Sequence, residues 1–124
     1  MADTTSAAMS LLLVINHPPH DGTDVAWNAL RLAATALEDG LDVRIFLMND
    51  GVDLARPESQ PAGAEFDLSR MLGDLMDKGA VVRLCQTCLE RCGIGRGQVM
   101  PQAEVAGMKD LLDWIKGSDK VLTF

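Results

Sequence analysis

The sequence predicts an α/β protein, a three-layer α/β/α sandwich with a mostly parallel sheet of about five strands. One observation behind this prediction is that short apolar segments typical of buried strands alternate with segments whose apolar residues recur at helical spacing. A second is the strand–helix–strand pattern over residues 10–48, because such units place their strands parallel with a right-handed crossover. A third is the length of 124 residues, which fits one domain.

The first strand is expected at residues 10–15, an apolar run that a Pro-Pro pair ends soon afterwards. Its length and composition fit a strand that is buried on both faces. A helix follows, capped by Asp21 or Thr23 and closed by Gly40. Its apolar stripe recurs at i, i+4, i+7 and i+11, and consists of Ala26, Leu30, Ala33 and Leu37. Alternating apolar residues over 41–48 predict the second strand.

The second half of the chain repeats this alternation. Residues 49–67 contain several prolines and glycines and are expected to be a loop with a helical turn. A helical stripe then runs over 68–76, and an apolar run at 80–84 predicts the third strand. The last helix is expected over 105–115 and is followed by a short strand at 121–124.

The charge and hydropathy of the chain exclude several classes of function. Its 11 basic and 18 acidic residues give a formal net charge of −7, which disfavours binding to nucleic acid or to an anionic membrane surface. No apolar run approaches the ~18 residues of a membrane-spanning helix. We therefore expect a cytoplasmic protein with no nucleic-acid or membrane partner. Residues 1–9 are expected to form a disordered leader, and residues 10–124 a single domain.

Several polar residues follow directly after the predicted strands. In a parallel α/β sheet, ligands and chemistry collect where the carboxyl ends of the strands meet. The residues at these ends are Asn16, His17, Asn49, Asp50 and Cys85. Five residues are therefore candidates for a pocket at this edge of the sheet. They are Asn16, His17, Asn49, Asp50 and Cys92, which follows Cys85 closely in the sequence.

The densest chemical signal is the cysteine segment that follows the third strand. A helical turn after Cys85 would place its sulfur at a helix N-terminus, where unpaired N–H groups favour an anion. Arg83 and Arg91 add positive charge, and both effects favour a nucleophilic thiolate. Cys88, three residues on, would share a helix face with Cys85 and assist it. The alternative is that Cys85 is an inert, buried residue at a strand end.

Cys92 extends the pattern to C-x2-C-x3-C, and three thiolates with His17 or His20 would make a zinc site. Structural zinc sites usually show two close ligand pairs, so we expect no metal site here. We also expect no cofactor, and we expect His17 and His20 to be solvated loop residues. The glycine-rich stretch at 93–97 lacks the Gly-Lys-Ser/Thr of a P-loop. It is expected to be a mobile flap beside the cysteines.

Four segments together resemble one known family. They are Asn-Ala-Leu-Arg-Leu-Ala at 28–33, Phe-Leu-Met-Asn-Asp-Gly-Val at 46–52, Cys-x-Thr-Cys at 85–88 and Asp-Lys-Val-Leu-Thr-Phe at 119–124. From about residue 11 to residue 124, the chain resembles the DsrE/DsrF-like (DsrEFH) family. This family includes sulfur-relay subunits of the TusD type and small YchN-like proteins.

The resemblance implies an α/β/α fold, a homo-oligomer (often a trimer or hexamer) and, in the sulfur-relay members, a persulfide on one cysteine. Cys85 occupies the position of that cysteine, eight residues before Gly93. Many relatives have Arg directly before this glycine, whereas here Cys92 stands there and Arg91 lies one residue earlier. Because the sulfur-relay members carry a persulfide, the resemblance also implies sulfur donor and acceptor proteins as partners.

Two functions remain open at this point. The first is a sulfur-handling protein, of the sulfurtransferase or sulfur-relay type, in which Cys85 accepts a persulfide and passes it on with help from Cys88. The second is a non-catalytic oligomeric binding module, whose strand-end pocket binds a small ligand or a partner protein and whose cysteines only pack.

Overall fold

The computed structural model describes residues 8–59 and 63–124. Most of the expected leader lies outside the described residues. Met9 lies within them and already joins the sheet, because its main-chain oxygen accepts a hydrogen bond from Asp42 N at 2.9 Å.

A single sheet of five strands forms the middle of the molecule, with every strand parallel to its neighbours. The strand order is β5-β4-β3-β2-β6. The strands are β2 (Ser10–Ile15), β3 (Asp42–Leu47), β4 (Val81–Cys85), β5 (Glu104–Ala106) and β6 (Lys120–Thr123). This arrangement confirms the predicted fold class.

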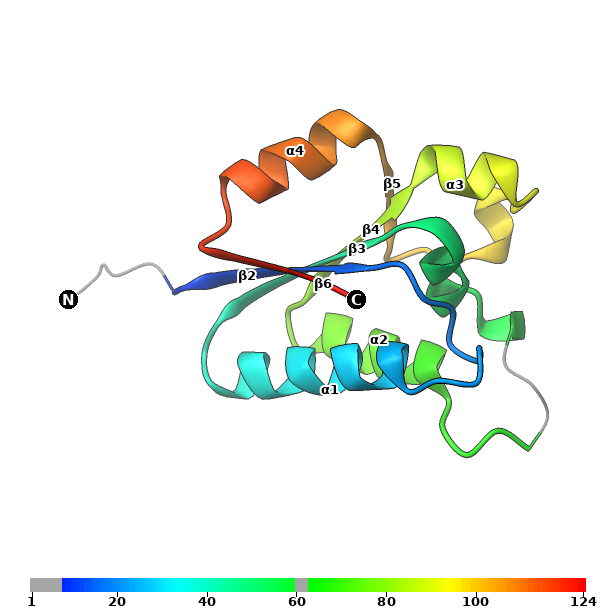
Figure 1. Ribbon diagram of the computed structural model, residues 1–124, viewed down its shortest axis with the longest axis horizontal. Coiled ribbons are helices and arrows are strands. Elements are labelled where there is room, and N and C mark those ends of the chain that lie inside the picture. The colour runs from blue at the N-terminus through cyan, green and yellow to red at the C-terminus, as the bar shows by residue number, and fades with distance from the viewer. Residues whose placement is uncertain (1–7, 60–62) are drawn as a thin grey trace.

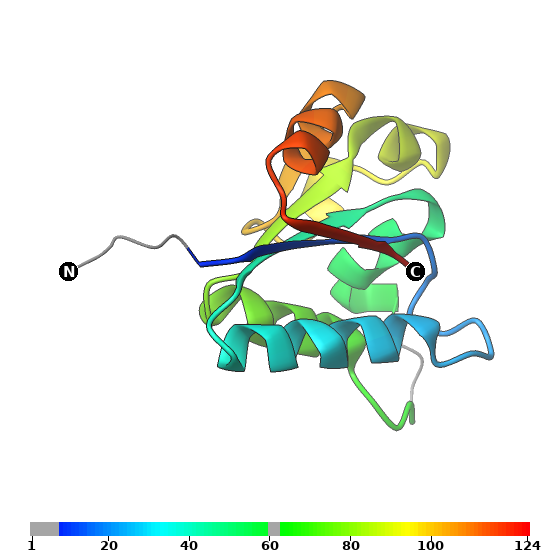
Figure 2. The same cartoon turned by 60° about the vertical axis from the view of Figure 1, so that its left-hand side comes forward.

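Helices cover both faces of the sheet and complete the three layers (Figures 1 and 2). On one face lie α1 (Val25–Glu38) and α2 (Leu68–Asp77), and on the other lie α3 (Gln86–Arg91) and α4 (Met108–Lys116). Short 3₁₀ helices, η1 (Asn49–Ala55), η2 (Pro57–Ser59) and η3 (Arg96–Gln98), occupy the connections. No helix among the described residues is long and apolar enough to cross a membrane.

The interior strand β2 is buried on both faces of the sheet. All six of its residues are buried, as the apolar run predicted. Leu11, Leu13 and Ile15 belong to the larger apolar cluster, which also holds the inward residues of α1 and α2. The intervening Leu12 and Val14 belong to a smaller cluster with Phe46 of β3 and Leu111 of α4. This division follows from the two-residue period of a strand.

The structure corrects three boundaries. Residue 105 is in strand β5 rather than in the last helix, which begins at Met108. The expected loop after the second strand begins with η1, in which Val52, Leu54 and Ala55 are buried. The N-cap residue of α1 is Asp24, which makes no side-chain cap hydrogen bond, while Thr23 Oγ1 accepts a hydrogen bond from Val25 N at 3.4 Å.

The turn between β3 and η1 packs directly against the end of β2. Met48 N donates to Ile15 O at 2.9 Å, and Gly51 N donates back to Met48 O at 2.8 Å. The approach is so close that a Cβ atom on Gly51 would lie 2.1 Å from Ile15 O. Only glycine fits at this position without a shift of the main chain.

Replacing Gly51 with Ala is expected to lower the free energy of unfolding by about 3 kcal/mol, because the main chain must move to relieve the overlap. Gly97→Ala is the matched control, since a Cβ atom on Gly97 would have nothing within 4 Å. The control should stay within about 0.5 kcal/mol of the parent protein. Urea unfolding followed by circular dichroism measures both values, and equal effects of the two substitutions would contradict this packing argument.

Candidate functional site

Cys85 is the last residue of β4 and the N-cap residue of α3. It is only 5% exposed and belongs to the apolar cluster between the sheet and α4. Its Sγ accepts a hydrogen bond from Cys88 N at 3.3 Å. The expected helical turn after Cys85 is therefore present, and an amide donor reaches the sulfur.

Burial raises the pKa of the Cys85 thiol, and its hydrogen bond with the Cys88 side chain raises the pKa further. The main-chain N–H of Cys88 acts in the opposite direction but does not reverse the shift. The main-chain N–H of Thr87 also lowers the pKa, yet a buried thiolate loses hydration that these amides do not replace. The surroundings of Cys85 therefore disfavour the thiolate that the sequence favoured.

Cys88 is half-buried and follows Cys85 by one turn of α3. Its Sγ accepts a hydrogen bond from Asn49 N, at 3.1 Å, across the gap between α3 and the start of η1. The two cysteines are linked through the Cys88 N–H, which donates to Cys85. The arrangement is a pair of adjacent free thiols, each of which accepts one main-chain N–H.

A short chain of hydrogen bonds continues from Asn49 across the edge of the sheet. Asn49 Nδ2 donates to Asn16 Oδ1 at 2.8 Å. Asn16 in turn donates from N and from Nδ2 to Phe124 O, at 2.8 and 3.2 Å. Of the predicted site residues, the structure therefore brings together Cys85, Cys88, Asn49 and Asn16.

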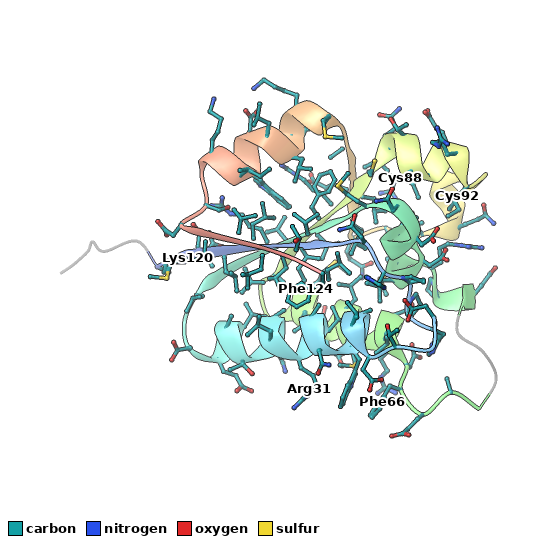
Figure 3. All side chains as sticks on the ribbon, viewed as in Figure 1. Arg31, Phe66, Cys88, Cys92, Lys120 and Phe124 are labelled. Atoms are coloured by element: carbon teal, nitrogen blue, oxygen red, sulfur yellow. The ribbon has the colours of Figure 1, made fainter. Side chains whose placement is uncertain are left out.

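The other predicted pocket residues lie apart from this chain of contacts. His17 hydrogen-bonds Asp21 at 2.7 Å, and this bond lowers the pKa of the Asp21 carboxyl to about 2. Asp50 is exposed in the first turn of η1. Cys92 is exposed as the C-cap residue of α3, at the opposite end of that helix from Cys85 (Figure 3).

Arg83 has partners other than the thiols, and Arg91 lies at the far end of α3 from Cys85. Arg83 Nε pairs with Glu104 at 3.1 Å, and its guanidinium lies 4.3 Å from the centre of the Trp114 ring. Arg91 is exposed in the last turn of α3. The hydrogen bonds that reach the two sulfurs come from main-chain N–H groups instead. A role for these arginines in stabilising a thiolate stays a prediction.

Within residues 8–59 and 63–124, no three His, Cys, Asp or Glu side chains are grouped so that they could hold a metal ion. The zinc alternative therefore has no ligand set in the described part of the chain. The glycine-rich stretch at 93–97 contains the buried Ile94 and is followed by the buried Val99, both in the larger apolar cluster, and its expected mobility stays a prediction.

A cavity of about 430 Å³ lies on the opposite layer, between the start of α1 and the segment before α2. Its walls include the stacked rings of Trp27 and Phe66, whose centroids are 4.7 Å apart. None of the five expected pocket residues lines it. This cavity is therefore separate from the thiol pair.

The family model of the DsrE/DsrF-like family matches residues 9–124. The chain belongs to this family. An uncharacterized protein of Methanocaldococcus jannaschii is 36% identical over 116 residues, which cover 94% of this chain and all of the relative. Protein YchN of Escherichia coli is 34% identical over 92% of this chain and 97% of its own. Sulfurtransferase TusD of Cronobacter sakazakii is 29% identical over 94% of this chain and its own full length.

Solved structures of this fold agree with the topology described above. The crystal structure of E. coli YchN superposes with a TM-score of 0.84 at 33% identity and covers 94% of this chain and 99% of that one. A protein of unknown function from Methanobacterium thermoautotrophicum has a TM-score of 0.74 at 12% identity, which shows the fold alone. The DsrE/DsrF-like fold is thus confirmed for this chain.

Sequence reasoning missed the main chain of Asn49, which it placed in the pocket only as a polar side chain. Asn49 has φ +52°, the left-handed region. Asparagine enters this region more readily than other residues with a Cβ. An Asn-Asp-Gly turn directly after a strand was the available signal.

The three thiols are expected to react with iodoacetamide at neutral pH in the order Cys92, Cys88, Cys85, because they are exposed, half-buried and buried. Since the folded-state pKa of Cys85 is raised, its reaction should need a pH above the ordinary thiol value of about 8.5. Peptide mapping by mass spectrometry at several pH values measures the order. In urea the three should react alike, and fast labelling of Cys85 in the folded protein at pH 7 would contradict the burial argument.

Proposed function

We propose that this DsrE/DsrF-like protein is a cytoplasmic sulfur carrier, which holds sulfane sulfur as a persulfide on Cys85 and passes it to an acceptor with the help of Cys88. The observation that carries the proposal is the thiol pair at the carboxyl end of β4, in which each sulfur accepts a main-chain N–H. A relative that spans the same length is named sulfurtransferase TusD, which supports the same class of chemistry.

The chemistry needs only thiols and a persulfide donor. A cysteine thiolate attacks the outer sulfur of a donor R–S–SH, a new S–S bond forms, and the S–S bond of the donor breaks. The donor leaves as R–S⁻ and takes up a proton. Transfer to an acceptor thiolate repeats the step in the other direction, so no net oxidation or reduction occurs. The pair therefore needs no metal or organic cofactor to act.

The burial of Cys85 suits storage more than first contact. A persulfide on a residue that is 5% exposed is shielded from small thiols that would strip its outer sulfur. Cys88, which is half-buried, lies where a donor or acceptor thiol can reach it. The two positions thus divide retention and access between them.

A non-catalytic oligomeric module remains the second candidate, and one surface favours it. Several large apolar side chains of α4 and β6 are exposed, namely Met108, Leu112, Ile115, Val121 and Leu122. Such a patch on a domain surface is typical of an interface. Self-association, as a trimer or hexamer, is compatible with either function. Sulfur transfer separates the two candidates.

The protein is exposed to a small-molecule persulfide, treated with a small thiol that strips accessible sulfur, and then desalted. The wild-type protein should keep one added sulfur atom (about 32 Da). Cys85→Ser should lose this retained sulfur, since the shielded position is gone. Cys92→Ser is the matched control and should retain it, because that residue is exposed at the far end of α3. Intact-mass spectrometry measures the adduct, and equal retention by Cys85→Ser and wild type would overturn the assignment. The binding-module alternative predicts no retained sulfur in any variant.

A further inference from the structure

Asn49 holds an unusual conformation directly beside the thiol pair. It is the only residue other than glycine with positive φ in the described part of the chain. This conformation costs free energy for a residue with a Cβ and persists only where the surroundings enforce it. Its result is that the main-chain N–H of Asn49 is directed at the Cys88 sulfur, at 3.1 Å.

The surroundings that enforce it are the ends of two other strands. The Asn49 side chain donates to Asn16 Oδ1 at 2.8 Å, and Asn16 is itself fixed by two hydrogen bonds to Phe124 O. On the other side, Gly51 lies against the main chain of Ile15 with no room for a side chain. The direction of the Asn49 N–H is therefore set from both sides of the turn.

The two sulfurs each accept one main-chain N–H, but they differ in burial and in the segment that supplies the donor. A hydrogen bond donated to a thiolate stabilises its charge, and charge-assisted hydrogen bonds are the stronger kind. Cys88 receives this donor and is half-buried, whereas Cys85 is buried among apolar side chains. Of the two sulfurs, Cys88 is therefore the less shielded, and its donor comes from the turn after β3.

We propose that Asn49, held by Asn16, is a positioning residue that makes Cys88 the thiol through which sulfur enters, before the sulfur moves to Cys85. This inference rests on the proposed sulfur-carrier function and adds an order and a device to it. Asn49 acts through its main chain on Cys88, while its side chain only fixes the turn.

The order is two balanced transfers. In the first, the Cys88 thiolate attacks the outer sulfur of a donor R–S–SH, the S–S bond of the donor breaks, and R–S⁻ leaves and is protonated. In the second, Cys85 attacks the outer sulfur of Cys88–S–SH, which gives Cys85–S–SH. The proton released by Cys85 passes to Cys88, which ends as a thiol. Each transfer breaks one S–S bond and forms another, so neither step needs an oxidant or a reductant.

The first experiment isolates Cys88 in a Cys85→Ser, Cys92→Ser background and measures its alkylation by iodoacetamide across pH. Asn49→Ala removes the side-chain tie and disfavours the left-handed turn, so the rate at neutral pH should fall about tenfold. Asn49→Gly removes the tie but allows positive φ, so its rate should lie between those of Asn49→Ala and the parent protein and remain measurably below the parent.

Asn28→Ala is the matched control, because Asn28 is an exposed asparagine of α1 whose Oδ1 accepts a hydrogen bond from Arg31. It should leave the alkylation profile unchanged. If Asn49→Ala fails to fold, as judged by circular dichroism, Asn49→Gly still tests the tie to Asn16. A profile of Asn49→Ala, or of Asn49→Gly in that case, equal to that of Asn28→Ala would overturn the positioning role.

The second experiment follows sulfur loading of the protein with all three cysteines by rapid quenching and peptide mapping. The added sulfur should appear first on Cys88 and then on Cys85, and Asn49→Ala should slow loading without changing the final amount on Cys85. Early label on Cys85 ahead of Cys88 would overturn the proposed order. A wild-type protein that retains no sulfur at all would instead overturn the carrier function, so the two failures are distinguishable.

Discussion

The register of the parallel sheet sets the position of every residue in the candidate site. β4, β3, β2 and β6 are neighbours in that order, and Leu47 pairs with both Ile15 and Leu84. The strands therefore end close to one level, and the residues that follow them meet there. The hydrogen bonds follow the same order, from Cys88 after β4 to Asn49 after β3, Asn16 after β2 and Phe124 after β6. A shift of one residue in any pair would separate these groups.

The two cysteines differ because they face different surroundings, although only two residues separate them. Cys85 ends a strand and points into the cluster that holds Phe46 and Leu111, so burial raises the pKa of its thiol. Cys88 lies one helical turn further and meets the edge of the sheet, where Asn49 offers an N–H. A shielded thiol beside a more accessible one fits the proposed sulfur carrier, because retaining sulfur and exchanging it place opposite requirements on access.

The fold could be predicted from the sequence because its strands are apolar runs bounded by turns and its helices carry clear stripes. The exception among the strands is β5, whose three residues are too few for a pattern and whose Val105 also fits the spacing of the last helix. The buried residues of η1 were missed because prolines and glycines around them indicated a loop. In the site, the strand-end rule placed Cys85, Asn16 and Asn49 correctly at one edge, since it depends only on where strands stop.

What the sequence could not give was the direction of individual groups. The sequence showed that Arg83 adds positive charge near the cysteines, but it could not show that the guanidinium lies over Trp114 and pairs with Glu104. Main-chain N–H groups supply the polar contacts instead, and they leave no trace in side-chain composition. They also carry no net charge and cannot rotate away, so their effect depends on the main-chain conformation alone. The turn at Asn49, whose conformation is held by contacts with other strands, is therefore a part of the site that side-chain composition does not reveal.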